Sequence, residues 1–206
     1  MTLPFSAAAD RNKEAIGDAL SGYFDGNIKV FEIGSGTGQH AIYLCERFPG
    51  LIWQTSDQSL HLETLSAAVS QSGLGNLHTP IELEVSSCTS QPKAMQALRE
   101  KQYSFVYSAN TAHIMSMEDV TSMFTLLGKV LAKAGFFALY GPFKVDGEHT
   151  SEGNLNFDQS LRTEKPHMGI RDKEELVTLG VKHGLQLLED ISMPANNRIL
   201  LWRQMS

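Results

Sequence analysis

A glycine-rich turn between an apolar run and a helical pattern limits what this chain can fold into more than any other feature of its 206 residues. The β-rich run 28–33 leads into the sequence GSGTG at 34–38, and apolar residues then recur at helical spacing from 41 to 48. Glycines at such a turn allow a tight backbone, close approach of a ligand and close packing of the helix on the strand. The N–H groups that open the helix can bind a carboxylate or a phosphate. The sequence therefore predicts the ligand-binding corner of an α/β fold.

Strand and helix patterns alternate along the rest of the chain. Further strands are expected at 51–55, 81–85, 103–108 and 136–140, and one intervening helix opens with the capping pattern of Ser116 and Asp119 and ends at Gly135. The last two strands, 185–193 and 198–203, have no helix between them, which predicts an antiparallel pair. We expect one domain over residues 1–206, with an N-terminal helical segment at 1–25. Its Rossmann-like sheet should have seven mostly parallel strands and a C-terminal antiparallel hairpin.

Composition narrows the class of protein. The formal net charge of −6 argues against a large nucleic-acid surface. No apolar run approaches the roughly 18 residues of a membrane span, and residues 1–10 lack the pattern of a secretory signal. Cys45 and Cys88, the two cysteines, fit a reducing compartment better than a disulfide framework. We expect a cytoplasmic protein that acts on a small molecule, without a metal, a membrane or nucleic acid.

The spacing of the glycines indicates which cofactor the turn binds. Dinucleotide-binding loops follow G-x-G-x-x-G, whose last glycine would fall on Gln39, whereas here it comes one place earlier at Gly38. This spacing favours S-adenosylmethionine over NAD. A C-terminal hairpin that closes a doubly wound sheet is the arrangement of the class I S-adenosylmethionine-dependent methyltransferase fold, which we therefore predict.

Acidic residues at the ends of the next two strands complete the predicted cofactor site. Asp57 stands about twenty residues beyond the glycine loop, where an acid accepts hydrogen bonds from ribose hydroxyls, although Ser56 and Asp57 would also suit a helix cap. Glu84 is a candidate partner of the adenine amino group or a solvated carboxylate, and Glu32 either touches the ligand or braces the loop. The candidate cofactor-binding residues are Glu32, Gly34, Ser35, Gly36, Thr37, Gly38, Asp57, Glu84 and Asn110.

The motifs resemble those of an uncharacterised, methyltransferase-like family catalogued as domain of unknown function 938. The similar segments are 11–13, 34–40, 53–57, 110–114, 140–150, 154–162, 169–172 and 193–197, which together span nearly the whole chain. The family pattern prefers proline at Thr55 and tryptophan at Met168, departures that leave cofactor contacts intact but bear on a substrate lid. The resemblance implies the fold and S-adenosylmethionine binding, and it implies no substrate.

Polar residues after the fourth strand are the predicted catalytic residues. Methyl transfer needs mainly alignment and a water-poor site, because the sulfonium is already activated. Asn110 and His113 follow strand 103–108 at the edge of the sheet where ligands bind. A histidine, whose unperturbed pKa is about 6.5, can take a proton from an oxygen or nitrogen nucleophile. The alternative for His113 is a buried structural histidine.

A long polar stretch, 141–171, is predicted to be a substrate lid, because loops of that length are usually functional or disordered. The alternative is a solvated excursion with local capping roles. The candidate substrate-contacting residues are Asn12, Tyr140, His149, Asn154, Arg162 and Arg171.

Two other functions stay open at this stage. Tyr140 and Lys144 have the spacing of the catalytic pair of short-chain NAD(P)-dependent oxidoreductases, but Gly141 and Pro142 between them forbid the continuous helix that such a pair needs. The other alternative is a catalytically silent S-adenosylmethionine-binding module, since no side chain is strictly required for the displacement.

Overall fold

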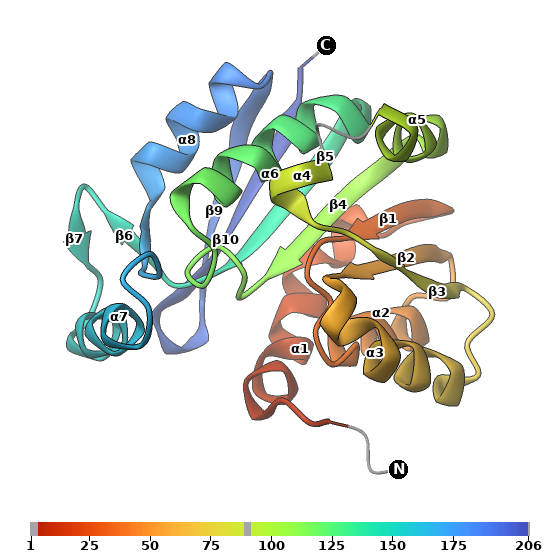
Figure 1. The fold of residues 1–206 in the computed structure, drawn as a ribbon, viewed down its shortest axis with the longest axis horizontal. Helices are drawn as coiled ribbons and strands as arrows, with labels where there is room; N and C mark the ends of the chain where they lie inside the picture. Colours follow the sequence, from red (N-terminus) through yellow and green to blue (C-terminus); the bar gives the residue numbers. More distant parts are fainter. Residues whose placement is uncertain (1–3, 89–91, 206) are drawn as a thin grey trace.

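The computed structural model describes residues 4–88 and 92–205, and its centre is a seven-stranded sheet (Figure 1). The strand order is β3-β2-β1-β4-β5-β10-β9, in which β1 to β5 run parallel and β10 runs antiparallel to both β5 and β9. This arrangement confirms the predicted sheet and its C-terminal hairpin. The strands are Ile28–Glu32 (β1), Leu51–Asp57 (β2), Leu77–Glu82 (β3), Tyr103–Ala109 (β4), Leu131–Gly141 (β5), Leu185–Met193 (β9) and Asn197–Gln204 (β10).

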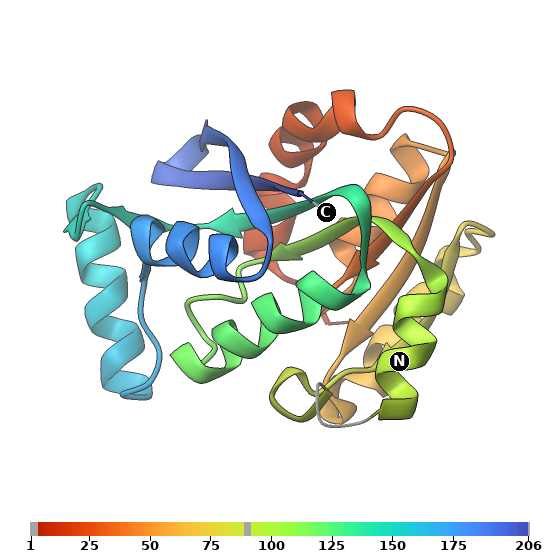
Figure 2. The same ribbon diagram turned by 90° about the horizontal axis from the view of Figure 1, so that it is seen from above.

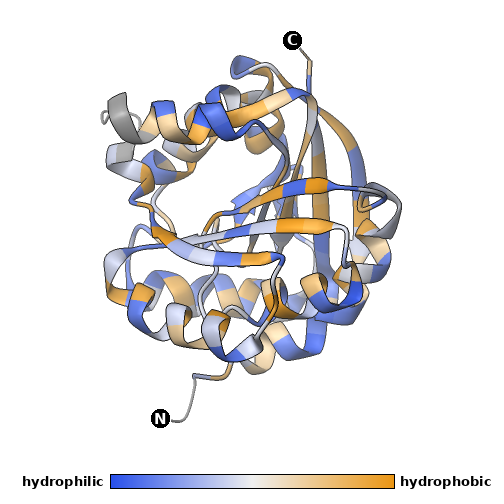
Figure 3. Ribbon diagram, turned by 90° about the vertical axis from the view of Figure 1, so that its right-hand side faces the viewer, coloured by the Kyte–Doolittle hydropathy of each residue, from blue (hydrophilic) through white to orange (hydrophobic). Residues whose placement is uncertain are grey.

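Helices cover both faces of this sheet (Figure 2). They are Ala7–Leu20 (α1), Gln39–Arg47 (α2), Ser59–Ser72 (α3), Val85–Cys88 (α4), Pro92–Lys101 (α5), Met117–Val130 (α6), Glu152–Glu164 (α7) and Lys173–Lys182 (α8). Side chains alternate across the strands, so that Val30 belongs to the core shared with α1, α2 and α3, while Phe31 belongs to the core shared with α5, α6 and α8. Hydrophobic residues accordingly concentrate on the strands and on one side of the helices (Figure 3). The sheet therefore separates two hydrophobic cores, one on each of its faces.

The element boundaries differ most from the sequence prediction at two places. The helix expected to run to Gly135 ends at Val130, because Leu131 is already extended and pairs with Tyr103, and Ala134 in a left-handed conformation then makes an irregular start to β5. The third strand lies at 77–82 rather than 81–85. It is an edge strand, where Pro80 is tolerated and exposed polar residues replace the apolar run that would have marked it.

Residues 141–171, which are predicted to be a substrate lid and are called the lid segment below, are folded. It contains Phe143–Val145 (β6), Glu148–His149 (β7) and α7, and with Arg171–Asp172 (β8) it forms a second sheet in the order β7-β6-β8. Asp172 accepts a hydrogen bond from Gly147 N at the hairpin tip, and its side chain also caps α8. In Figures 1 and 2, α7 lies beyond the end of the large sheet at which β5 continues into β6.

No helix within 4–88 and 92–205 has the length and apolar character that crossing a membrane requires. The same residues contain no group of three or more histidine, cysteine, aspartate or glutamate side chains suited to holding a metal ion.

Candidate active site

The three glycines of the loop after β1 are needed for different reasons. All have positive φ, 74° at Gly34, 55° at Gly36 and 75° at Gly38, a region that favours glycine. A Cβ at Gly34 would lie 2.7 Å from Thr111 Cγ2, and one at Gly38 would lie 3.0 Å from Leu65 Cδ1. A Cβ at Gly36 would meet no atom within 4 Å. Gly34 and Gly38 therefore let the loop pack against the fold, whereas Gly36 faces open space.

Glu32 braces the glycine loop through a buried hydrogen bond to Ser35. Its Oε2 accepts hydrogen bonds from Ser35 Oγ at 2.7 Å and from Trp53 Nε1 at 3.0 Å. The side chain is 2% exposed, and this burial raises the pKa of Glu32 to about 7. Of its two predicted roles, bracing the loop is the one that this geometry supports.

The outer part of the loop is tied to the segment before α1. Thr37 Oγ1 donates to Gln39 Oε1 at 2.9 Å, and the same oxygen accepts from Ser6 N at 2.5 Å. Gln39 Nε2 returns a bond to Ser6 O at 3.3 Å. Sequence reasoning missed Gln39 and Ser6, because their pairing joins residues 33 positions apart.

Asp57, at the end of β2, faces the loop. Its Oδ2 accepts from Gly36 N at 2.6 Å and its Oδ1 from Gln58 N at 2.8 Å. The cap residue of α3 is Gln58, without a side-chain capping bond, so Asp57 does not cap the first turn of that helix. Each carboxylate oxygen keeps a lone pair for a further donor.

A cleft of about 600 Å³ opens at the carboxyl ends of β1 to β4. It includes Gly34, Gly36, Asp57, Glu84 and Asn110 from the predicted cofactor set. Glu32, Ser35, Thr37 and Gly38 do not line it and instead shape the loop. The lining residues among those described are Ile33, Gly34, Gly36, Asp57, Gln58, Leu60, His61, Leu83, Glu84, Val85, Ala109, Asn110, Thr111, Ile114, Met115, Asp119, Lys165, His167 and Met168.

Two polar residues on the cleft wall differ in how firmly they are held. Asn110 takes a left-handed conformation with φ 59°, which asparagine tolerates, and its N–H donates to Tyr140 O at 2.9 Å. The exposed Glu84 carboxylate accepts from Gln58 Nε2 at 3.0 Å and 3.3 Å and from Ser86 Oγ at 3.2 Å. An adenine contact by Glu84 would have to compete with these bonds.

His113 lies outside the cleft lining, between the end of β5 and α7. It is 7% exposed, and its ring meets Phe157 edge-on with centroids 5.2 Å apart. Neither ring nitrogen hydrogen-bonds to any of the described residues. Burial, with a contribution from the Arg171 charge, lowers the pKa of His113 to about 4. The imidazole is therefore neutral at pH 7 and can accept a proton.

The predicted substrate-contacting residues are engaged elsewhere, and none of the six lines the cleft. Asn12 Oδ1 lies 2.6 Å from Nε2 of the buried His40, and the Asn12 side chain also hydrogen-bonds to Tyr140. Asn154 Nδ2 donates to Thr150 Oγ1 at 2.9 Å and to Asn196 O at 3.1 Å.

The remaining three are held by contacts within or beside the lid segment. Arg162 Nε donates to Asp158 Oδ2 at 3.0 Å, and His149 Nε2 lies 3.5 Å from the same oxygen. Arg171 donates to three backbone carbonyl groups. Lys165, His167 and Met168 are the lid residues that reach the cleft, and the preference for tryptophan at Met168 was the one sequence signal there.

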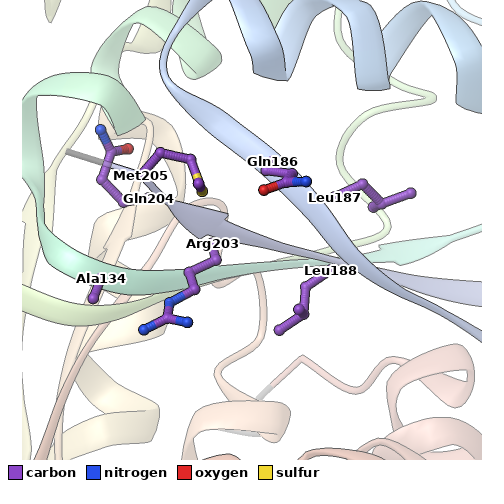
Figure 4. Close-up of a pocket in the computed structure, with 7 residues that line it drawn as sticks. All are labelled: Ala134, Gln186, Leu187, Leu188, Arg203, Gln204 and Met205. Carbon is purple, nitrogen blue, oxygen red and sulfur yellow. The ribbon is translucent and has the colours of Figure 1, made fainter.

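A second hollow lies far from these residues (Figure 4). It has a volume of about 390 Å³ and is lined by Ala134, Gln186, Leu187, Leu188, Arg203, Gln204 and Met205. These residues belong to the start of β5 and to the matching ends of β9 and β10, the edge opposite the glycine loop. Ligands of open α/β sheets bind at the carboxyl ends of the strands, so this hollow is not the candidate site.

Solved structures of similar fold are methyltransferases. An O-methyltransferase family protein from Burkholderia thailandensis matches with a TM-score of 0.80 and 14% identity over 97% of this chain and 58% of its own. Human N-acetylserotonin methyltransferase in complex with SAM matches with 0.78 and 10% over 97% and 53%. The chain thus spans little more than half the length of these two proteins.

A putative sarcosine dimethylglycine methyltransferase from Galdieria sulphuraria matches over more of its own length. Its TM-score is 0.70 and its identity 16%, over 98% of this chain and 92% of that one. These likenesses show the class I S-adenosylmethionine-dependent methyltransferase fold that the glycine spacing and the C-terminal hairpin predict. The model of the family described as "Protein of unknown function (DUF938)" matches residues 3–204, and the chain belongs to that family.

Proposed function

We propose that this protein transfers a methyl group from S-adenosylmethionine to a small-molecule acceptor. The observation that carries the proposal is the hydrogen bond between Asp57 and Gly36 N in the lining of the cleft. This bond fixes a carboxylate next to a glycine that has free space where a Cβ would be. Asp57 would bind the ribose hydroxyls, and the glycine loop would bind the methionine carboxylate. Leu83 and Val85 would contact the adenine. The cofactor supplies an activated methyl group.

The acceptor side of the proposal rests on Asn110 and His113. Asn110 lines the cleft at the end of β4, and His113 follows it on the turn before α6. A neutral imidazole without a hydrogen-bond partner among the described residues can take the proton of a hydroxyl or amine acceptor. Lys165, His167 and Met168 of the lid segment line the cleft, and there they would limit the access of water to a bound acceptor.

The geometry argues against one alternative function, the short-chain oxidoreductase, and does not separate the other, the silent cofactor-binding module, from the proposal. Tyr140 lies in β5 and Lys144 lies in β6, so this pair does not share a helical face as a short-chain oxidoreductase would require. A silent cofactor-binding module has the same cleft and differs only in turnover. A cytoplasmic location stays a prediction from the cysteine content.

Calorimetry and labelled methyl transfer test the proposal together. The purified protein should bind S-adenosylmethionine and its demethylated product with micromolar to millimolar affinity, on the order of 4 to 8 kcal/mol, and should bind NAD far more weakly. Small-molecule extract fractions supplied with methyl-labelled cofactor should yield a labelled product. A heat of binding with NAD, and none with S-adenosylmethionine, would overturn the cofactor assignment. Cofactor binding without transfer to any fraction would favour the silent module.

A further inference from the structure

The turn that carries His113 is held by the lid segment through its backbone carbonyl groups. Arg171 Nε donates to Ala112 O at 3.0 Å, and Arg171 Nη2 donates to Met115 O. Between these two, Gly169 N donates to His113 O at 2.9 Å. Three carbonyl groups of the turn, those of Ala112, His113 and Met115, are therefore bound by Gly169 and Arg171.

Arg171 is itself fixed in place. Its backbone pairs with Phe143 where β8 joins β6, and its Nη2 also donates to His167 O at 2.8 Å. Three of its five N–H donors are thus used on carbonyl oxygens, which a planar guanidinium can span and a single ammonium cannot. The side chain is committed to the turn rather than to a substrate.

The close fit at Gly169 excludes other residues from the contact. Its φ is 154°, and a Cβ there would lie 2.6 Å from Arg162 Nη2 and 2.8 Å from Asp158 Oδ1. A side chain at this position would displace Arg162 and Asp158, which pack against the residue that binds His113 O.

The charge of Arg171 also acts on His113. The neighbours of the ring from β5 and α7 are the uncharged Gly141 and Phe157, and Arg171 is the charged group whose field lowers the pKa of His113. Arg162, Asp158 and Glu175 act on Arg171 in turn. A positive charge beside the imidazole disfavours its protonated form.

We propose that Arg171 is a positioning residue for His113: its contacts with Ala112 O and Met115 O hold the 112–115 turn and keep the ring of His113 against Phe157, with the guanidinium charge acting on the imidazole. The inference rests on the proposed function only for the role of His113. The geometry and the charge can be tested without an acceptor.

Proton NMR on the full chain separates the two effects. The His113 ring signals are assigned by their absence in His113→Gln, and their titration is followed together with the nuclear Overhauser contact to Phe157. In the parent, His113 should stay neutral down to about pH 5 with the contact present. Arg171→Met should raise the midpoint of the His113 titration, although burial still keeps it below the ordinary value, and should weaken the contact with Phe157.

Arg171→Lys separates charge from geometry, because it keeps the charge and loses the three-way contact. This variant should weaken the nuclear Overhauser contact between His113 and Phe157, while the midpoint of the His113 titration stays low. Lys173→Gln is the matched control, since Lys173 bonds to Glu174 and Asp190 and should leave both signals unchanged. If Arg171→Met does not fold, Arg171→Lys decides.

An unchanged midpoint and contact in a folded Arg171 variant would overturn the inference. A parent protein that binds no S-adenosylmethionine would instead overturn the proposed function and leave these NMR results standing. The two failures are therefore distinguishable.

Discussion

The glycine loop and the lid segment are two halves of one cleft, and they differ in how their polar side chains are used. At the loop, Gly36 and Asp57 face the cleft as their sequence positions predict. In the lid segment, His149, Arg162 and Arg171 contact protein groups instead. A local motif fixes the chemistry of the first half. In the second half, Arg162 pairs with Asp158 four residues away and Arg171 binds Ala112 O 59 residues away, so polar composition alone does not identify a substrate contact.

The largest expected effect lies in the lid segment, at Asp158. This carboxylate is 5% exposed, and it accepts from Ile170 N at 2.6 Å as well as from Arg162. Arg162 beside it helps to keep the pKa of Asp158 below its usual value, against the effect of burial. Asp158→Ala should therefore destabilise the lid segment by about 3 kcal/mol, because it leaves buried donors unpaired.

Hydrogen exchange measures this effect region by region. Peptides from 143–172 should exchange faster in Asp158→Ala, while peptides from β1 and α2 should match the parent. Glu164→Ala, at an exposed position on the same helix, is the control. Equal exchange in the parent and Asp158→Ala would show that the lid segment does not depend on this carboxylate.

The next effect lies beneath the glycine loop and depends on pH. Because burial raises the pKa of Glu32 to about 7, the folded state keeps this proton while the unfolded state loses it near pH 4.5. The free energy of unfolding should therefore fall as pH rises from 4.5 to 7, by about 3 kcal/mol from this group. Glu32→Gln should lack that loss.

Urea unfolding at pH 5 and pH 8 tests the Glu32 prediction. Buried His40 and His113, whose pKa values are lowered to about 4, produce the opposite slope between pH 4 and 6.5, so the quantity compared is the difference between variant and parent. Glu46→Gln, on an exposed position of α2, is the control. A constant difference at both pH values would contradict the prediction.

At the junction of the two halves, His113→Ala should reduce turnover about a hundredfold, or about 2.7 kcal/mol, once an acceptor is known. Cofactor affinity should stay within a few-fold of the parent. Turnover of the parent should hold to about pH 5 and then fall, below the midpoint near 6.5 of an unperturbed histidine. Rate against pH for the parent, His113→Ala and the exposed control His78→Ala gives the answer. Unchanged turnover in His113→Ala would make His113 a structural residue.

The sequence could predict the sheet and the loop because both depend on local patterns. The alternation of Val30 and Phe31, the glycine spacing and the capping box of Ser116 each act within a few residues. It could not predict that Asn12 would contact His40, or that Arg171 would reach Ala112, because these pairs are joined only by the folded chain. The edge strand β3 was misplaced for a related reason, since an exposed edge needs no apolar run.

The most direct test of the account is the affinity of Asp57→Ala for S-adenosylmethionine. Calorimetry should show binding weakened by about 1.5 to 3 kcal/mol, roughly 10-fold to 150-fold, in a protein that remains folded. Asp25→Ala, at an exposed position before β1, should bind as the parent does, and Asp158→Ala should lose less affinity than Asp57→Ala. Equal affinity of the parent and a folded Asp57→Ala variant would contradict the account, because the carboxylate paired with Gly36 would then have no part in binding the cofactor.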